Sequence, residues 1–203
     1  MFALDEKHPY WHVRSVIGRL ESVASLFLSF YVYRPQSLVD QRRTIEVSRN
    51  DFLNASFVTG LFRQCRDQEE IAFHSIVIDM SGRTLHLPLV DMATTRVEAL
   101  VDVNAFLQDS QFSGFVWFES GRSFHGYASE LVDGRGWQIA MGKMLLCNPR
   151  SGEAIVDPRW IGHRIIAGYA ALRWSCNTKQ YLSMPSRLQP SFASRTPRLL
   201  AGS

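Results

Sequence analysis

The chain has 203 residues, of which 46% are hydrophobic and 12% aromatic, which is enough for one domain with a substantial core. The formal net charge of +3 argues against a protein that coats nucleic acid without a defined site. No stretch approaches the about 18 consecutive apolar residues of a membrane span, so no membrane partner is expected.

The N-terminus and the cysteines predict a cytoplasmic protein. Residues 1–7 lack the basic start and apolar block of a signal peptide. Cys65, Cys147 and Cys176 are odd in number and far apart, and they form no Cys-x-x-Cys zinc pattern. The cationic residues are almost all arginines, which suit bidentate phosphate contacts, although a GC-rich genome produces the same bias.

The first 70 residues are expected to form a helical and mixed layer. Apolar residues at helical spacing predict a helix over 13–30, and short strands follow at 31–33 and 44–47. Ser48 or Asn50 can cap a second helix that runs over 52–68.

The centre of the chain predicts two hairpins with a helix between them. Strands over 71–78 and 85–90 flank a Ser-Gly turn, a helix follows over 96–108, and a second hairpin covers 115–132. This order indicates an α+β fold with a mixed or antiparallel sheet, related to the RNA-recognition-motif (RRM-like) architecture, with helices packed on one face.

The remaining residues complete one domain over 1–186, made of the N-terminal layer 1–70 and a core 71–186. Residues 137–147 are predicted as helix or strand, and further elements are expected at 153–156 (strand), 159–171 (helix) and 172–174 (strand). Residues 187–203 are rich in Arg, Ser and Pro and predict a mobile basic tail.

The stretch from Ser120 to Tyr127, Ser-Gly-Arg-Ser-Phe-His-Gly-Tyr, lies at a strand-turn-strand corner. There Ser120, Arg122, Ser123 and His125 can converge on one ligand, and hydroxyl, guanidinium and imidazole groups bind phosphate. An ordinary hairpin turn with one surface histidine is the alternative.

Two aspartates end predicted strands, Asp91 after 85–90 and Asp157 after 153–156. Carboxylates so placed can hold a divalent cation, and Asp91 can face His125 across one sheet surface. Asp91 could instead be a helix N-terminal carboxylate. His163 is expected on a helix face, and His74 and His86 are expected to face solvent or each other.

These residues, in this order, resemble the archaeo-eukaryotic primase superfamily, which includes the primase-polymerases, over about residues 71–185. Asp91 matches the first acid of its first motif, Ser123-Phe-His125 its Ser-x-His motif, and Val156-Asp157 its hydrophobic-Asp motif. The basic stretch that follows in many members is matched by Arg173, Ser175, Asn177 and Lys179.

The resemblance implies a catalytic core of the archaeo-eukaryotic primase type and template-directed nucleotidyl transfer. It implies Mg²⁺ or Mn²⁺, nucleoside triphosphates and a single-stranded DNA or RNA template. Asp91 and Asp157 would be metal ligands and, with His125, the catalytic residues. The nucleotide- or nucleic-acid-binding residues would be Ser120, Arg122, Ser123, Arg173, Ser175 and Lys179.

The first motif departs from the family pattern, because Ala93 stands where a second acid is expected. Asp157 with a neighbour such as Glu119 could compensate, one metal could bind weakly, or the domain could bind nucleotides without polymerising. The alternative function is therefore a catalytically silent relative that recruits a helicase or nuclease. A plain RNA-binding module of the recognition-motif type would instead require exposed aromatic side chains on the central strands.

Overall fold

The computed structural model describes residues 4–108 and 113–188. The helices are α1 (Pro9–Gly18), α2 (Arg49–Leu53), α3 (Ala55–Phe62), α4 (Glu98–Leu107), α5 (Gly134–Leu146) and α6 (Pro158–Ala167). The strands are β1 (Val23–Val32), β2 (Arg43–Ser48), β3 (Glu69–Asp79), β4 (Thr84–His86), β5 (Leu89–Asp91), β6 (Phe115–Glu119), β7 (Phe124–Ala128), β8 (Ala171–Arg173) and β9 (Ser186–Arg187).

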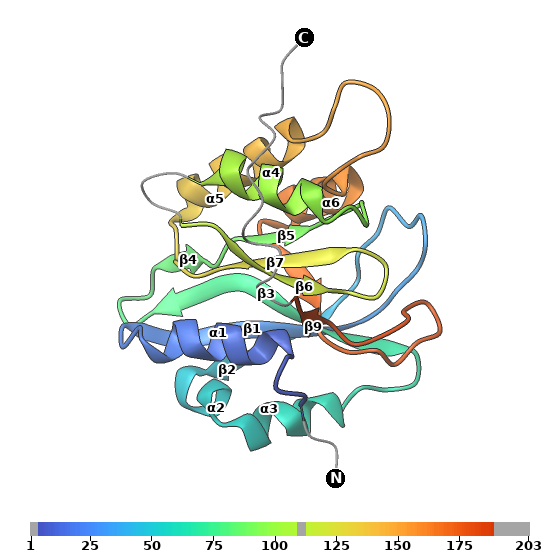
Figure 1. Cartoon of the computed structure of the whole chain (residues 1–203). Coiled ribbons are helices and arrows are strands. Elements are labelled where there is room, and N and C mark those ends of the chain that lie inside the picture. The colour runs from blue at the N-terminus through green and yellow to red at the C-terminus, as the bar shows by residue number, and fades with distance from the viewer. Residues whose placement is uncertain (1–3, 109–112, 189–203) are drawn as a thin grey trace.

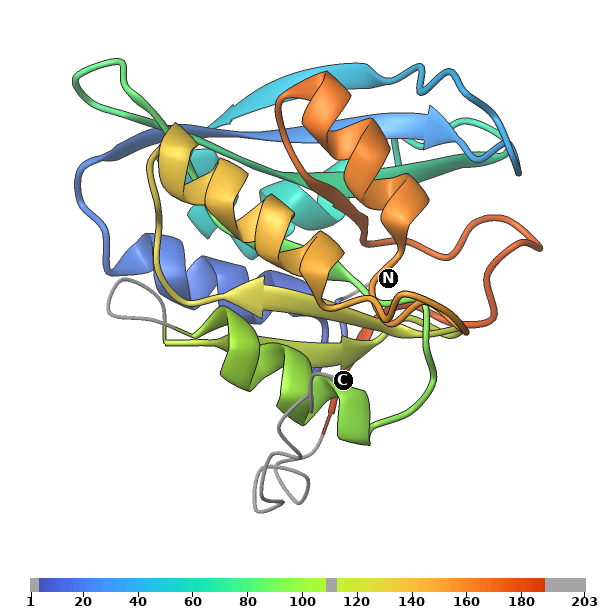
Figure 2. The same ribbon diagram turned by 90° about the horizontal axis from the view of Figure 1, so that it is seen from above.

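The strands form two antiparallel sheets rather than the one sheet expected. The first sheet has the order β2-β1-β3-β4, with β8 also paired to β3, and the second has the order β5-β7-β6-β9. Helices α1 to α3 lie toward one end of the molecule and α4 to α6 toward the other (Figure 1). Seen from above, α5 and α6 lie over the two sheets (Figure 2). The α+β class with antiparallel sheets is thus confirmed.

The chain crosses from one sheet to the other at Leu87-Pro88. His86 ends β4 in the first sheet, and Leu89 begins β5 in the second. The expected single strand over 85–90 is therefore two short strands, because the chain changes partners at this point. The crossing brings Asp91, at the end of β5, to the edge where the two sheets meet.

One core joins the sheets, and Trp174 lies at its centre. Trp174 is fully buried and stacks on Phe73 of the first sheet, with ring centroids 4.9 Å apart. Its indole N–H donates to the Tyr127 hydroxyl of the second sheet at 3.1 Å. A buried indole needs such a partner, so this bond fixes the position of the residues just after β8 against the second sheet.

The predicted helix over 13–30 is wrong beyond Gly18, because residues 23–32 form strand β1. This strand is buried along most of its length on both faces, so its apolar residues do not alternate with polar ones. A continuous apolar run of this kind cannot be told from a buried helix by periodicity. The predicted helix over 52–68 is also wrong in its extent: α2 ends and α3 begins at Asn54, whose side chain caps α3.

The structure also bears on the smaller expectations. Residues 153–156 form only an isolated bridge, between Val156 and Met92, in place of the expected strand. Of residues 137–147, which were expected to be helix or strand, 137–146 belong to helix α5 and Cys147 is its C-cap. His74 and His86 are buried, against the expectation, and each contacts a serine hydroxyl. Of the basic tail expected over 187–203, residues 187 and 188 are described, with Arg187 in β9, and the rest lies outside the described residues.

No helix within the described ranges is long and apolar enough to cross a membrane.

Candidate functional site

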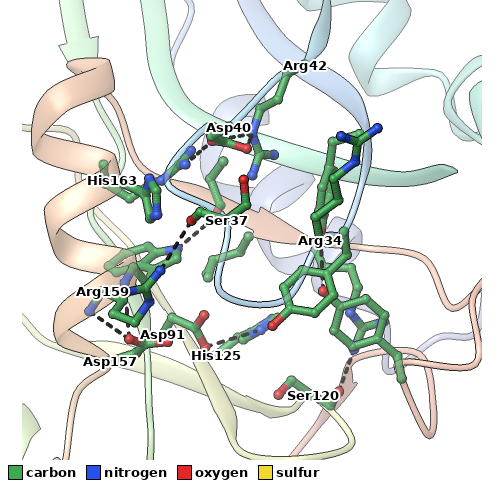
Figure 3. A pocket seen from close by; sticks show the side chains of 18 of the residues that line it. Arg34, Ser37, Asp40, Arg42, Asp91, Ser120, His125, Asp157, Arg159 and His163 are labelled. Carbon is green, nitrogen blue, oxygen red and sulfur yellow. Dashed lines mark hydrogen bonds and ion pairs between the residues drawn. The ribbon is translucent and has the colours of Figure 1, made fainter.

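A cavity of about 410 Å³ lies where β1, β5, β7 and β8 come together, bordered by α6 and by residues 33–42, the loop between β1 and β2 (Figure 3). Its size is that of a small-molecule site. Its charged lining consists of six arginines (Arg34, Arg42, Arg122, Arg159, Arg164, Arg173) and three aspartates (Asp40, Asp91, Asp157). Because the arginines outnumber the aspartates, the cavity favours an anionic ligand.

Asp91 and His125 are direct neighbours in the second sheet, as the sequence predicted. They are register partners in the β5–β7 pair, and His125 Nε2 lies 3.6 Å from Asp91 Oδ1. Burial holds the pKa of His125 well below its usual value, and the charge of Arg173 lowers it further. The imidazole is therefore neutral, and its buried Nδ1 has no hydrogen-bond partner among the described residues.

Asp157 lies beside Asp91. The Asp157 backbone N–H donates to the Asp91 carbonyl at 2.9 Å, and both residues line the cavity. Burial raises the pKa of Asp91 to about 8, and the neighbouring Asp157 carboxylate adds to the rise, whereas Arg173 and Arg164 oppose it. Asp91 therefore holds a proton at neutral pH in the ligand-free site.

Asp157 owes its position to helix α6, of which it is the N-cap. Its Oδ1 accepts from the backbone N–H groups of Arg159 at 2.8 Å and Trp160 at 3.1 Å. Pro158 fits the first helical position, where its missing N–H is not needed. The Asp-Pro pair thus starts a helix that places a carboxylate at the cavity.

The turn at 120–123 presents its polar groups to the same cavity. The Ser120 N–H donates to the Ser123 carbonyl at 2.9 Å, and the two hydroxyl oxygens are 3.2 Å apart. Gly121 has a φ of 92°, and a Cβ there would lie 3.0 Å from the Ser183 backbone nitrogen, so glycine is required. Arg122 is exposed at the rim of the cavity.

Arg173 holds this turn against β8. Its guanidinium donates to the backbone carbonyls of Ser120 and Ser175, and it stacks 3.9 Å from the Tyr181 ring centroid. Arg173 is buried and lines the cavity, so it contributes positive charge beside Asp91 and His125.

Two predicted binding residues lie outside the cavity lining. The Ser175 hydroxyl is fully buried, donates to the Glu70 carboxylate and accepts from the Ile71 N–H at 2.8 Å, so it ties its segment to β3. Lys179 is exposed on the segment that follows.

The structure also shows where Ala93 lies, at the position where the family pattern has a second acid. Strand β5 ends at Asp91, so Ala93 lies beyond the strand, exposed and outside the cavity lining. Glu119 is likewise exposed and outside the lining. The second carboxylate beside Asp91 is therefore that of Asp157.

Sequence reasoning missed the cavity residues of loop 33–42 and the arginines of α6. Asp40, Arg42, Arg159 and Arg164 line the cavity, as does His163, which was expected only on a helix face. Arg159 and His163 lie four residues apart and thus on one side of α6, next to the Asp157 cap; that spacing was the available signal.

Residues 4–108 and 113–188 contain no group of three or more His, Cys, Asp or Glu side chains placed to hold a metal ion. Two carboxylates are nevertheless present, and their mutual repulsion contributes to the raised pKa of Asp91. A cation would relieve that repulsion. Magnesium commonly takes one or two carboxylates and completes its shell with phosphate oxygens and water, so the pair suits a cation that arrives with a phosphorylated ligand.

A family model described as AEP-like, archaeo-eukaryotic primase 1D-like, matches residues 49–186. The chain belongs to this family, which confirms the resemblance drawn from the motifs. Enzymes of the family generally use divalent metals, and membership implies binding of nucleotides and nucleic acid. The matched residues include Asp91, His125 and Asp157 but not the loop 33–42. No curated protein and no solved structure matches the chain.

Proposed function

We propose that this protein is a primase-type nucleotidyltransferase that binds a nucleoside triphosphate with Mg²⁺ or Mn²⁺ in the arginine-rich cavity and acts on a single-stranded DNA or RNA template. One observation carries the proposal: Asp91, His125 and Asp157, which belong to three separate motifs, line one cavity with six arginines.

In this proposal Asp91 and Asp157 hold the divalent cation. When bound, the cation neutralises negative charge on the phosphates that it contacts. Asp91 gives up its proton when the cation binds, since a carboxylate ligand must be ionised. The N-cap bonds fix Oδ1 of Asp157, so the helix sets the direction in which its carboxylate faces the cavity.

The remaining lining residues position the phosphates. The neutral His125 can donate one N–H to a phosphate oxygen, and the Ser120 and Ser123 hydroxyls can donate from the adjacent turn. Arg122 approaches from the rim, where its guanidinium can pair with two phosphate oxygens. Exposed Lys179 is available for a template phosphate, whereas buried Arg173 supports the turn and adds charge.

A catalytically silent nucleotide-binding protein that recruits a helicase or nuclease is the second candidate. The observation that favours it is the incomplete acid set: two carboxylates line the cavity beside His125, and one of them holds a proton at neutral pH. This candidate predicts ligand binding without product.

The test is primer synthesis from labelled nucleoside triphosphates on a single-stranded template with either metal. We expect product from the wild type and from Asp67→Asn, which removes one exposed surface charge, and none from Asp91→Asn. Nucleotide binding without product in both metals would support the silent candidate. An Asp91→Asn protein as active as wild type would remove Asp91 from the proposed site.

A further inference from the structure

The carboxylate of Asp40 occupies a position between two arginines of the cavity (Figure 3). Arg42 Nε lies 2.9 Å from Oδ1 and 2.8 Å from Oδ2, and Arg164 of α6 also donates to Oδ2. Asp40 belongs to the loop 33–42, which precedes the residues matched by the family model. An internal anion therefore occupies an arginine pair in a cavity whose net charge favours anions.

Arg164 is an incompletely satisfied cation. The residue is only 2% exposed, and its Nε and Nη1 have no hydrogen-bond partner among the described residues. Its guanidinium lies 5.6 Å from the Tyr169 ring centroid. A buried charge is costly unless it is paired and hydrogen-bonded. The two unpartnered nitrogens of Arg164 can therefore donate to an anion that has more oxygens than one carboxylate.

The loop that carries Asp40 is held mainly by polar contacts. Arg159 donates to the Ser37 carbonyl at 3.2 Å, in addition to the pairs made by Asp40. Leu38 and Val39, at the tip, are 83% and 65% exposed, so the loop gains little from burying these apolar side chains. The Asp40–Arg42 pair lies within the loop, so replacement of the Asp40 contacts by a ligand would remove the bond from Asp40 to Arg164 of α6 and leave the Arg159 bond to Ser37 in place.

We propose that Arg42 and Arg164 form a phosphate-binding subsite that Asp40 occupies in the ligand-free protein, and that an entering phosphate group displaces the Asp40 carboxylate. Arginine binds phosphate and carboxylate by the same forked hydrogen bonds, and phosphate offers an additional oxygen for the unpaired nitrogens of Arg164. The phosphate can belong to a nucleoside triphosphate or to the backbone of a strand. The inference rests on the proposed function only for the identity of the ligand, a nucleoside triphosphate or a nucleic-acid strand.

The test uses calorimetric binding of inorganic tripolyphosphate to the full chain. Asp40→Asn keeps the shape of the side chain but removes the competing charge, so its Kd should fall by about fivefold to fiftyfold, since hydrogen bonds to charged groups are among the stronger ones. Asp67→Asn is the matched control and should bind as wild type does. In the Asp40→Asn background, Arg164→Gln should abolish the gain. Arg42→Gln makes the same test at a partly buried position of the loop, should the change at buried Arg164 prevent folding.

Two further probes identify the source of the phosphate. Tighter binding of a nucleoside triphosphate by Asp40→Asn, with unchanged binding of an oligonucleotide that lacks a terminal phosphate, assigns the subsite to the nucleotide. The reverse result assigns it to the strand. Unchanged or weaker binding of all three probes by Asp40→Asn overturns the subsite.

These measurements need no turnover, so they separate the two proposals. If Asp40→Asn binds more tightly but the wild type makes no product, the subsite is supported and the proposed nucleotidyltransferase activity is contradicted. If the wild type makes product but Asp40→Asn does not bind more tightly, only the proposed subsite is contradicted.

Discussion

At the residue scale, the chemistry of the cavity depends on which side chains are charged before a ligand arrives. Burial leaves His125 neutral and keeps a proton on Asp91, whose pKa is about 8. The six lining arginines remain protonated at neutral pH. The net charge of the ligand-free cavity is therefore more positive than it would be with all three aspartates ionised. Such a cavity suits a triphosphate that binds together with its own cation.

Replacement of Asp91 by Asn should change how the stability of the metal-free protein depends on pH. An unfolded Asp has a pKa near about 3.9, whereas that of folded Asp91 is about 8. Between these values the folded state holds a proton that the unfolded state has released, so wild-type stability falls as pH rises from about 4 to 8 and then levels off. Asp91→Asn removes this loss and should be more stable than the wild type at pH 9 by several kcal/mol, since each pKa unit corresponds to about 1.4 kcal/mol.

Urea unfolding at pH 4, 6 and 9 measures the effect. The two proteins should be similar in stability at pH 4 and diverge as pH rises. The surface variant Asp67→Asn should follow the wild type throughout. Parallel stability profiles for wild type and Asp91→Asn would show that Asp91 ionises normally in the folded protein.

At the element scale, helix α6 links stability to the site, because Asp157 both caps the helix and lines the cavity. Asn caps helices about as well as Asp, whereas Ala does not. Asp157→Asn should therefore keep wild-type stability within about 0.5 kcal/mol, and Asp157→Ala should cost about 1 kcal/mol. Both should lose primer synthesis, because both remove the second carboxylate.

The matched control for this prediction is Asp133, which caps α5 through a 2.7 Å bond to the Gly136 N–H and does not line the cavity. Asp133→Ala should cost a similar amount in urea unfolding and retain product formation. Full activity in Asp157→Asn would limit Asp157 to the role of a cap.

The features of the fold that depend on residues close together in the sequence could be predicted. Alternating strands and a glycine turn were enough to place His125 opposite Asp91, and the order of the motifs was enough to indicate the family. The pairing of Asp40 with Arg164 joins residues 124 positions apart, and no periodicity reveals it. Strand β1 was missed because burial on both faces removed its alternation.

At the scale of the whole molecule, the cavity exists because two sheets meet. Asp91 and His125 come from the second sheet and Arg173 from the first, while Trp174, just after β8, bonds across to Tyr127. Hydrophobic core residues from both sheets form one cluster. The site and the core therefore depend on the same interface, and we expect the two sheets to unfold together.

A ligand bound in this cavity should accordingly stabilise the entire fold. Binding to the native state alone adds RT ln(1 + [L]/Kd), which is about 2.7 kcal/mol at a ligand concentration of 100 times Kd. We expect a nucleoside triphosphate at that excess to shift one cooperative transition by about this amount in urea unfolding followed by both tryptophan fluorescence and circular dichroism. Arg164→Gln, whose Kd is expected to be higher, should show a smaller shift at the same ligand concentration, and Asp67→Asn the full shift. Two separate transitions, of which only one responds to the nucleotide, would show that the sheets unfold independently and that the cavity does not bridge them.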